Sequence, residues 1–165
     1  MTTEKTIRDL IAEHPFFGAL PDADIDLIAG CGQNVVFEPG AFIFREGDEA
    51  THFHLLRDGD VRLEIRAPQG PLAIQTLHGG DILGWSWLVP PHTKRFDARV
   101  LTPTRAVAMD GVCLRRKCDE DPRLGYELLQ RFAHIIGERL QATRLQLLDL
   151  YGDAPTRAEG EGHRG

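Results

Sequence analysis

The sequence lacks long apolar runs and any excess of positive charge. None of its apolar stretches approaches the roughly 20 residues that a transmembrane helix needs. The first nine residues lead into a polar amphipathic segment and not into the apolar core of a signal peptide. The 165 residues carry a formal net charge of −6, whereas surfaces that bind nucleic acid usually show a basic stripe. We therefore expect a cytoplasmic protein that contacts neither a membrane nor, directly, a nucleic acid.

Cysteine is scarce as well, and no catalytic constellation is visible. The chain has three cysteines, Cys31, Cys113 and Cys118, an odd number without a CxxC spacing. This usage is typical of a reduced cytoplasmic protein with small buried thiols. The sequence contains no Ser-His-Asp arrangement, no paired carboxylates and no phosphate loop. We therefore predict no enzyme, no metal and no cofactor.

The composition that remains is that of a globular domain. Hydrophobic residues make up 42% and charged residues 27% of the chain. A single domain of this length can bury roughly two thirds of its unfolded surface without staples. One compact domain is therefore expected.

The first 33 residues predict an N-terminal helical segment. Ile7, Leu10 and Ile11 follow the i, i+3, i+4 spacing of a helix with one buried stripe. His14-Pro15 ends this helix, because the residue before a proline avoids the helical region. A second short helix is expected to begin near Pro21, with acidic residues in its first turn.

Between residues 34 and 110 the apolar period shortens to two. The clearest strand is 61–66, where Val61, Leu63 and Ile65 alternate with charged residues. Such runs are separated by Gly, Pro and Asp turns, and Arg57-Asp58-Gly59-Asp60 is a hairpin signal. Many short strands of this kind predict an α+β fold whose centre is an antiparallel β-roll of the jelly-roll type.

Residues 111–151 are predicted to be helical. Asp110 suits the N-cap of a short helix over 112–118, and Pro122 can open a long helix from about 123 to 151. A helix of about 28 residues is roughly 42 Å long, more than the width of the roll. Its apolar residues step by three and four, the spacing of a dimer seam, and include Leu129, Phe132, Ile136, Leu140 and Leu147. We predict a homodimer through this helix and a disordered tail over 152–165.

Several glycine-centred motifs recur along the chain. They are Pro39-Gly40, FREGD at 44–48, FHLLRDG at 53–59 followed by Val61, GDILG at 80–84, and RLQAT at 139–143. Together they resemble the cyclic-nucleotide-binding domain of the catabolite-activator (Crp/Fnr-like) family and of regulatory kinase subunits, over about residues 16–151. Regulators of that family carry a helix-turn-helix domain after the long helix, whereas about 14 residues remain here. The resemblance therefore implies a free-standing domain whose output passes to a separate partner protein, for which a redox enzyme is the suggested class.

In that family the segment 80–99 is a phosphate-binding cassette. A short helix offers backbone N–H groups to the cyclic phosphate, a Glu after the Gly binds the ribose, and an Arg pairs with the phosphate. Gly84 fits this pattern, Trp85 stands in place of the Glu, and the phosphate Arg falls at Lys94 or Arg95. The resemblance assigns a degenerate site to Gly84, Trp85, Ser86, Trp87, Lys94, Arg95, Phe96 and Asp97, with Thr143 and Arg144 as its lid. We therefore expect no conventional binding of cAMP or cGMP.

Two interpretations of the aromatic residues remain open. Trp85, Trp87 and Phe96 either line a pocket for another flat, aromatic ligand or fill the vacated pocket as core. If they fill it, the domain is a ligand-free interaction module.

The charged residues of the cassette are equally ambiguous. Lys94 and Arg95 either bind a small anion, which would make the domain a genuine nucleotide or anion sensor, or are solvated. Asp97 and Arg99 alternate on a strand and are expected to pair with each other.

A third class of function rests on two histidines. His52 and His54 lie on one strand face, as in the metal sites of cupin-like enzymes. A cupin would also need a nearby Glu and a third His, but Glu64 is too far along, and neither His78 nor His92 lies in a motif. Two surface histidines are therefore expected.

Overall fold

The structure, a computed structural model, describes residues 4–152. Its elements are α1 (Ile7–Glu13), α2 (Asp22–Ala29), β1 (Gly32–Phe37), β2 (Phe42–Phe44), β3 (His52–Asp58), β4 (Asp60–Ala67), β5 (Gly70–His78), β6 (Ile82–Leu83), β7 (Asp97–Val100), β8 (Thr104–Asp110), α3 (Gly111–Glu120) and α4 (Pro122–Gly152). The predicted α+β class is confirmed, and the helices and strands follow the predicted order except for the helix expected in the cassette, which does not form. The tail predicted to be disordered lies, from residue 153 on, outside the described residues.

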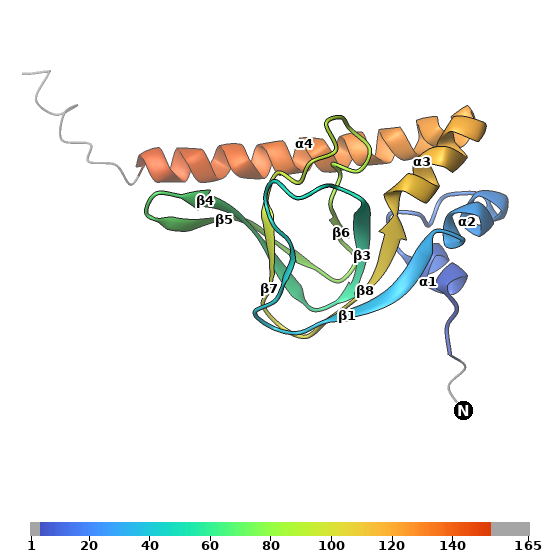
Figure 1. The fold of residues 1–165 in the computed structure, drawn as a ribbon, viewed down its shortest axis with the longest axis horizontal. Coiled ribbons are helices and arrows are strands. Elements are labelled where there is room, and N and C mark those ends of the chain that lie inside the picture. The colour runs from blue at the N-terminus through green and yellow to red at the C-terminus, as the bar shows by residue number, and fades with distance from the viewer. Residues whose placement is uncertain (1–3, 153–165) are drawn as a thin grey trace, which may run out of the picture.

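The strands form two four-stranded sheets that face each other (Figure 1). One sheet has the order β1-β8-β3-β6 and the other β2-β7-β4-β5, and the neighbouring strands are antiparallel. This is the predicted β-roll. The hairpin predicted at 57–60 is wrong: Gly59 makes a turn with a φ of +96°, but β3 and β4 belong to different sheets and do not pair, so the chain crosses from one sheet to the other there.

Two apolar clusters hold the domain together. The inside of the roll is filled by Phe44, Leu56, Val61, Leu63, Ile74, Leu77, Leu83, Ala98 and Ala106. The second cluster joins the roll to the helices and includes Phe17, Ile28, Phe53, Trp87, Leu114, Leu128 and Phe132. The long helix is therefore packed onto the roll through its first half.

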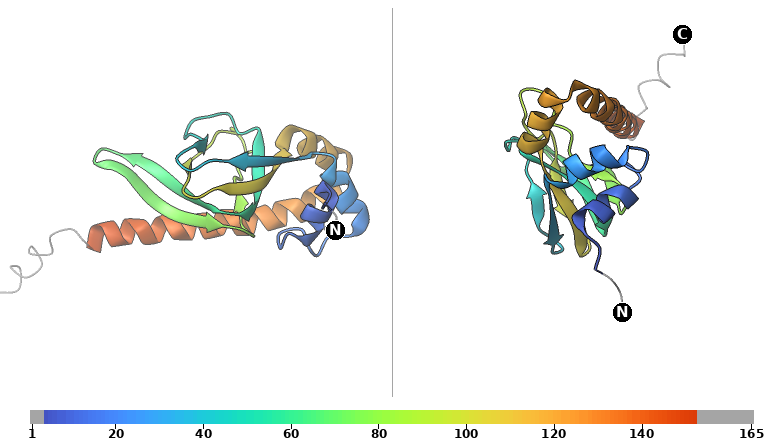
Figure 2. Two further views of the ribbon diagram at one scale, coloured as in Figure 1. Left: turned by 90° about the horizontal axis from the view of Figure 1, so that it is seen from below. Right: turned by 90° about the vertical axis from the view of Figure 1, so that its right-hand side faces the viewer.

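The helix α4 has 31 residues, which corresponds to roughly 46 Å. It runs along one side of the roll and continues past it beside the β4–β5 hairpin, while α1 and α2 cover one end (Figures 1 and 2). Asp110 caps α3 as predicted, since its carboxylate accepts the N–H groups of Val112 and Cys113. No helix of the described residues is long and apolar enough to cross a membrane.

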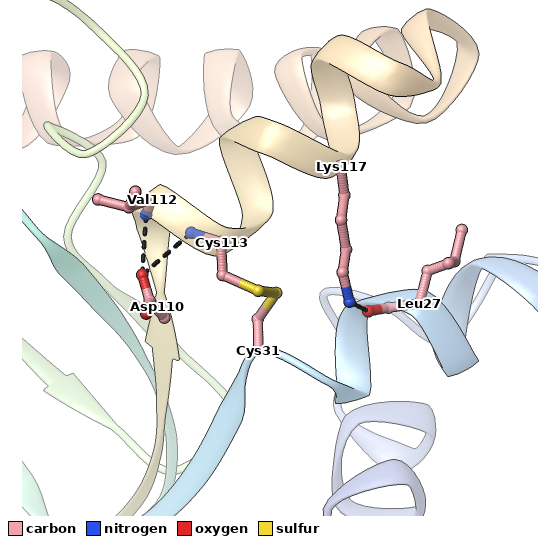
Figure 3. Close-up of a disulfide and its surroundings, with 6 residues drawn as sticks. All are labelled: Leu27, Cys31, Asp110, Val112, Cys113 and Lys117. Carbon is pink, nitrogen blue, oxygen red and sulfur yellow. Dashed lines mark hydrogen bonds between the residues drawn. A yellow bond between two sulfur atoms is a disulfide. The ribbon is translucent and has the colours of Figure 1, made fainter.

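The expectation of reduced thiols is wrong for two of the three cysteines. Cys31 and Cys113, 82 residues apart, form a disulfide with their Cα atoms 5.8 Å apart (Figure 3). The pairing of Gly32 at the start of β1 with Met109 on β8 brings them together. Cys118 remains a free thiol, and its burial raises its pKa. The cysteines therefore no longer indicate a reducing compartment.

Candidate functional site

The predicted cassette lies between β6 and β7, but it contains no helix. Only isolated turns are present, in which Leu88 N–H donates to Trp85 O at 3.1 Å and His92 N–H donates to Val89 O at 3.0 Å. Pro90 and Pro91 interrupt the segment, and prolines provide no N–H donor. The row of N–H groups that a helical cassette offers to a phosphate is therefore missing.

Backbone hydrogen bonds attach the second half of the cassette to the turn between β2 and β3. Lys94 N–H donates to Asp48 O at 2.8 Å, and Gly47 N–H donates to Lys94 O at 2.9 Å. Ala50 N–H donates to His92 O at 2.7 Å. The cassette is thus held in one position by the roll itself.

Trp87 is a core residue. Its side chain is 0% exposed and stacks on Phe53, with ring centroids 4.8 Å apart and planes at 20°. It also meets Phe132 of α4 edge-on at 5.1 Å. The guanidinium of Arg115 on α3 donates a hydrogen bond to the backbone carbonyl of Trp87. Trp87 therefore connects the cassette with β3 and α4 through its indole and with α3 through its backbone carbonyl.

The remaining aromatic residues of the site lie on either side of Trp87. Trp85 is half-buried against the cluster between roll and helices, and Phe96 packs against the interior of the roll. Ser86 is buried. Gly84 has a φ of +99° and lies against Phe53 and the Lys94 ammonium. The structure thus places these residues together, with their apolar surfaces turned toward the core.

Lys94 is buried, not solvated. It is 5% exposed, its ammonium donates to His52 O at 2.8 Å, and its Nζ lies 4.1 Å from the centre of the Phe44 ring. Burial lowers the pKa of Lys94 from 10.5 to about 8, and the carboxylate of Asp48 opposes this effect. Arg95, by contrast, is exposed.

A cavity of about 240 Å³ lies beside Lys94 and is lined by Ile43, Phe44, Asp48, Glu49, Thr51, His52, His54 and Lys94.

The expectation of two surface histidines is wrong for His54, which is 8% exposed. Its Nδ1 has no hydrogen-bond partner among the described residues. Burial, followed by the nearby Lys94 and His52, lowers the pKa of His54 from 6.5 to about 3, so the ring is neutral.

Asp97 and Arg99 do not pair with each other, because each has another partner on the outer face of the second sheet. Asp97 is 3% exposed; its carboxylate accepts the N–H of Glu46 at 2.7 Å and lies 3.4 Å from Arg45 and 3.6 Å from Arg66. Arg99 pairs with Glu64 at 3.0 Å.

This ionic cluster joins two carboxylates that would otherwise repel. Glu64, which is 1% exposed, also pairs with Arg62 at 3.3 Å. Glu64 and Asp97 are direct partners across β4 and β7, and like charges in that position destabilise a sheet unless they are compensated. The surrounding arginines supply the compensation.

The two residues assigned to a lid do not cover the cassette cavity. The Thr143 hydroxyl donates to Arg139 O of its own helix at 2.9 Å, and Arg144 is exposed. The helix is instead anchored by Arg139, which is 4% exposed and whose guanidinium donates to the backbone carbonyl of Ile82. Burial lowers the pKa of Arg139. Arg139 was not among the predicted site residues, although it stands in the RLQAT motif.

The predicted dimer seam divides between two faces of α4. Phe132 is 0% exposed and belongs to the core of its own chain, so its assignment to a seam is wrong. Leu129, Leu140 and Leu147 are 49%, 69% and 45% exposed, and Ile136 is half-buried. These four residues form a stripe beside the inner face, and their role in a dimer stays a prediction.

A metal site is absent from the described part of the chain. No group of three or more His, Cys, Asp and Glu residues there could hold a metal ion. His52 and His54, whose side chains raised this alternative, line the cavity beside Lys94, but with the carboxylates of that cavity they form no such group.

An antiparallel roll with a glycine-opened cassette and a long C-terminal helix defines a class of regulatory domains. The chain belongs to the cyclic nucleotide-binding domain family, whose pattern matches residues 34–121. It is 28% identical over 151 residues to a CRP-like cAMP-activated global transcriptional regulator of Mycobacterium tuberculosis, covering 90% of this chain and 66% of the regulator. The chain thus spans slightly less than two thirds of that relative.

Two solved structures share the fold. One comes from Geobacter metallireducens and is described as a cyclic nucleotide-binding protein; it has a TM-score of 0.70 and 29% identity, with 77% of this chain and 92% of the other covered. The second is a cyclic nucleotide-binding domain from Methylobacillus flagellatus, with a TM-score of 0.72, 18% identity, and coverage of 87% and 81%. These similarities confirm the fold that the motifs predicted.

Proposed function

We propose that this chain is a non-enzymatic regulatory module that does not bind cAMP or cGMP in the manner of its family and acts through a separate partner protein. One observation carries the proposal. The side chains that would contact a nucleotide make contacts within the chain: Trp87 stacks on Phe53, and Lys94 donates to the carbonyl of His52.

The ribose and phosphate positions both support the proposal. Trp85 offers an indole where the family has a carboxylate, and a site that lacks the partner of a sugar hydroxyl loses much affinity. The phosphate position offers the ammonium of Lys94, which is already engaged.

The long helix is the proposed route of output. Phe132 packs on Trp87, and Arg139 is bound to the carbonyl of Ile82, two residues before Gly84. A change in the cassette would therefore move α4. The exposed stripe of Leu129, Ile136, Leu140 and Leu147 fits a second copy of the helix, because its spacing of seven, four and seven keeps one face. We propose a homodimer through this stripe.

A second candidate function is that of a small-ligand sensor. The cavity beside Lys94 holds a neutral His54 whose Nδ1 is unpartnered in the described structure, and an unpaired buried polar atom is costly. A small polar ligand that reaches Lys94 and His54 would satisfy both groups.

A thermal-shift titration with cAMP and cGMP tests the proposal. A ligand at 100 times its Kd stabilises by about 2.7 kcal/mol, which at this size corresponds to roughly 5–10 °C. We expect no shift at millimolar nucleotide. A shift would overturn the proposal; its loss in Lys94→Met but not in Arg95→Gln would assign the phosphate contact to the buried cation, and the reverse pattern would assign it to the exposed Arg95.

The partner protein requires a separate experiment. Purified protein should capture the same partner in the presence and absence of cyclic nucleotide. The matched variant Trp87→Phe, which keeps an aromatic ring at the cassette–α4 contact, should capture it more weakly if the cassette controls the helix.

A further inference from the structure

A second cavity lies between the N-terminal helix and the roll. It has a volume of about 260 Å³ and is lined by Lys5, Leu10, Glu13, His14, Pro15, Leu56, Arg57, Gly80 and Arg105. None of these is one of the eight residues assigned to the cassette. A water molecule takes about 30 Å³ in the liquid, so the cavity has room for a small ligand together with water.

The wall of this cavity contains a buried histidine with a defined tautomer. His14 is 7% exposed, and its Nδ1 accepts the N–H of Phe16 at 3.3 Å. Burial lowers the pKa of His14, against a smaller opposing effect of the backbone at Leu56 and Asp81. The neutral ring therefore carries its proton on Nε2.

The Nε2–H donor of His14 is unsatisfied. No group of the described residues forms a hydrogen bond with it. The carbonyls of Leu56 and Asp81 lie near enough to the ring to oppose the lowering of its pKa, but neither forms a hydrogen bond of good geometry with Nε2; they accept the N–H groups of Gly80 at 2.8 Å and of Leu56 at 3.0 Å. A buried donor without an acceptor costs about 1–3 kcal/mol, so an acceptor from a ligand would find a prepared partner.

The charged side chains that line this cavity are mostly cationic, although the whole chain is acidic, and the carboxylate of Asp81 lies near His14. Three cationic side chains, Lys5, Arg57 and Arg105, line the cavity together with one carboxylate, Glu13. Lys5 pairs with Glu13 at 2.7 Å, and Arg105 pairs with Asp58. No ion pair of Arg57 is found within residues 4–152. Its guanidinium is thus available for a bidentate contact with an oxyanion.

We propose that the cavity between α1 and the roll is a binding site for a phosphate-class oxyanion, held by Arg57 and the Nε2–H of His14, with the Asp58-bound Arg105 beside them. A phosphate dianion suits a cavity lined by three cationic side chains, Lys5, Arg57 and Arg105, better than a single carboxylate does. The ligand is either inorganic phosphate or the phosphate group of a small metabolite. Apart from Gly80, no lining residue belongs to the cassette segment 80–99, and the inference goes beyond the proposed function.

An anion bound at this site would affect the long helix α4 through direct contacts. Pro15 forms part of the wall, and the next residue, Phe16, packs edge-on against Phe132 of α4 at 4.8 Å. Arg131 of α4 also donates to the carbonyl of Phe16 at 2.6 Å. An anion that draws His14 and Pro15 toward the roll would therefore act on the same helix as the cassette.

Isothermal titration calorimetry of the full chain with sodium phosphate tests the proposal, with sodium chloride of equal ionic strength as the blank. We expect saturable binding of phosphate, and at least about tenfold weaker binding to Arg57→Gln, since a charge-assisted hydrogen bond is lost. Arg116→Gln, an exposed arginine on α3, and Lys94→Met in the cassette should bind like the wild type. Glycerol 3-phosphate in place of phosphate distinguishes the two sources: tighter binding assigns the site to a phosphorylated metabolite.

Three results would overturn this inference. The first is no saturable heat with either phosphate or its ester. The second is equal weakening in Arg57→Gln and Arg116→Gln, which would indicate a general effect of charge. The third is weakening in Lys94→Met alone, which would place the anion in the cassette. A proton–nitrogen spectrum of the histidine side chains gives an independent readout, because phosphate but not chloride should shift the Nε2–H signal of His14.

Discussion

The ammonium of Lys94 donates a hydrogen bond to the backbone carbonyl of His52 at 2.8 Å. This contact joins the end of the cassette to the first residue of β3. It directs the cation toward the protein's own backbone, at the position where the family presents a cation to a phosphate.

The buried state of Lys94 predicts a rise of stability with pH. Its pKa is lowered from 10.5 to about 8, so between these values the unfolded chain binds a proton that the folded chain has released. Unfolding therefore becomes harder as the pH rises, by up to about 3 kcal/mol for this group. The free energy of unfolding, measured with urea, should rise between pH 7 and pH 10 for the wild type relative to Lys94→Met. Arg95→Met is the control and should follow the wild type. If the free energy of unfolding of the wild type and of Lys94→Met differed by the same amount at both pH values, burial of the ammonium would be contradicted.

The buried ring of His54 predicts sensitivity to acid. Its pKa is lowered from 6.5 to about 3 in the folded protein. Between these pH values His54 is protonated in the unfolded chain but stays neutral in the folded chain. Stability is complete above pH 6.5 and decreases as the pH falls toward 3, by up to about 4–5 kcal/mol. Relative to His54→Phe, the wild type should weaken between pH 7 and pH 4. His52→Gln, at the exposed histidine on the same strand, should follow the wild type.

The two tryptophans should differ in their contribution to stability. Trp87 is fully buried, and Trp87→Ala should reduce the free energy of unfolding by about 3–5 kcal/mol. Trp85 is only partly buried, and Trp85→Ala should cost about 1–2 kcal/mol. Denaturant unfolding measures both values. A loss below about 0.5 kcal/mol for Trp85→Ala would mean that the indole is free for a ligand or partner.

The stripe on α4 predicts a dimer that one charge can break. Ile136→Asp should give a monomer by size-exclusion chromatography with light scattering, because a carboxylate in an apolar seam is not compensated. Leu145 is also exposed, at 51%, but it lies off the stripe. Leu145→Asp should therefore remain dimeric. If both variants keep the mass of the wild type, the helix is not the seam.

The disulfide predicts a redox-dependent stability. It closes a loop between residues 82 positions apart, for which the chain-entropy relation gives about 4 kcal/mol. Unfolding of the wild type should shift by about this amount on addition of a dithiol reductant. The double variant Cys31→Ser/Cys113→Ser should unfold like the reduced protein and ignore the reductant, whereas Cys118→Ser should respond like the wild type.

Periodicity and local motifs in the sequence were sufficient for the fold. The alternation along 61–66 is a local signal that appears in the structure as β4, and the turn signal at Gly59 appears as a turn of positive φ that leads from one sheet to the other. The glycine spacing also identified the family. These features depend on neighbours within a few residues, which a sequence shows directly.

The site depended on contacts between residues far apart in the chain. Lys94 and Arg95 are adjacent and alike in sequence, yet the roll buries one and exposes the other. Asp97 pairs with Arg45 and Arg66, and not with Arg99. The register of β4 and β7 places Asp97 opposite Glu64, and Glu64 is the partner of Arg99. Cys31 met Cys113 through the pairing of β1 with β8.

The sequence by itself thus determined which elements form and how they alternate, since backbone preference and apolar period are properties of short stretches. Only the tertiary structure decided which cations are buried, which carboxylates are compensated and which thiols are joined. The reason is physical: burial and pairing energies depend on the surroundings that the whole chain builds around a group, and two adjacent residues can receive opposite surroundings.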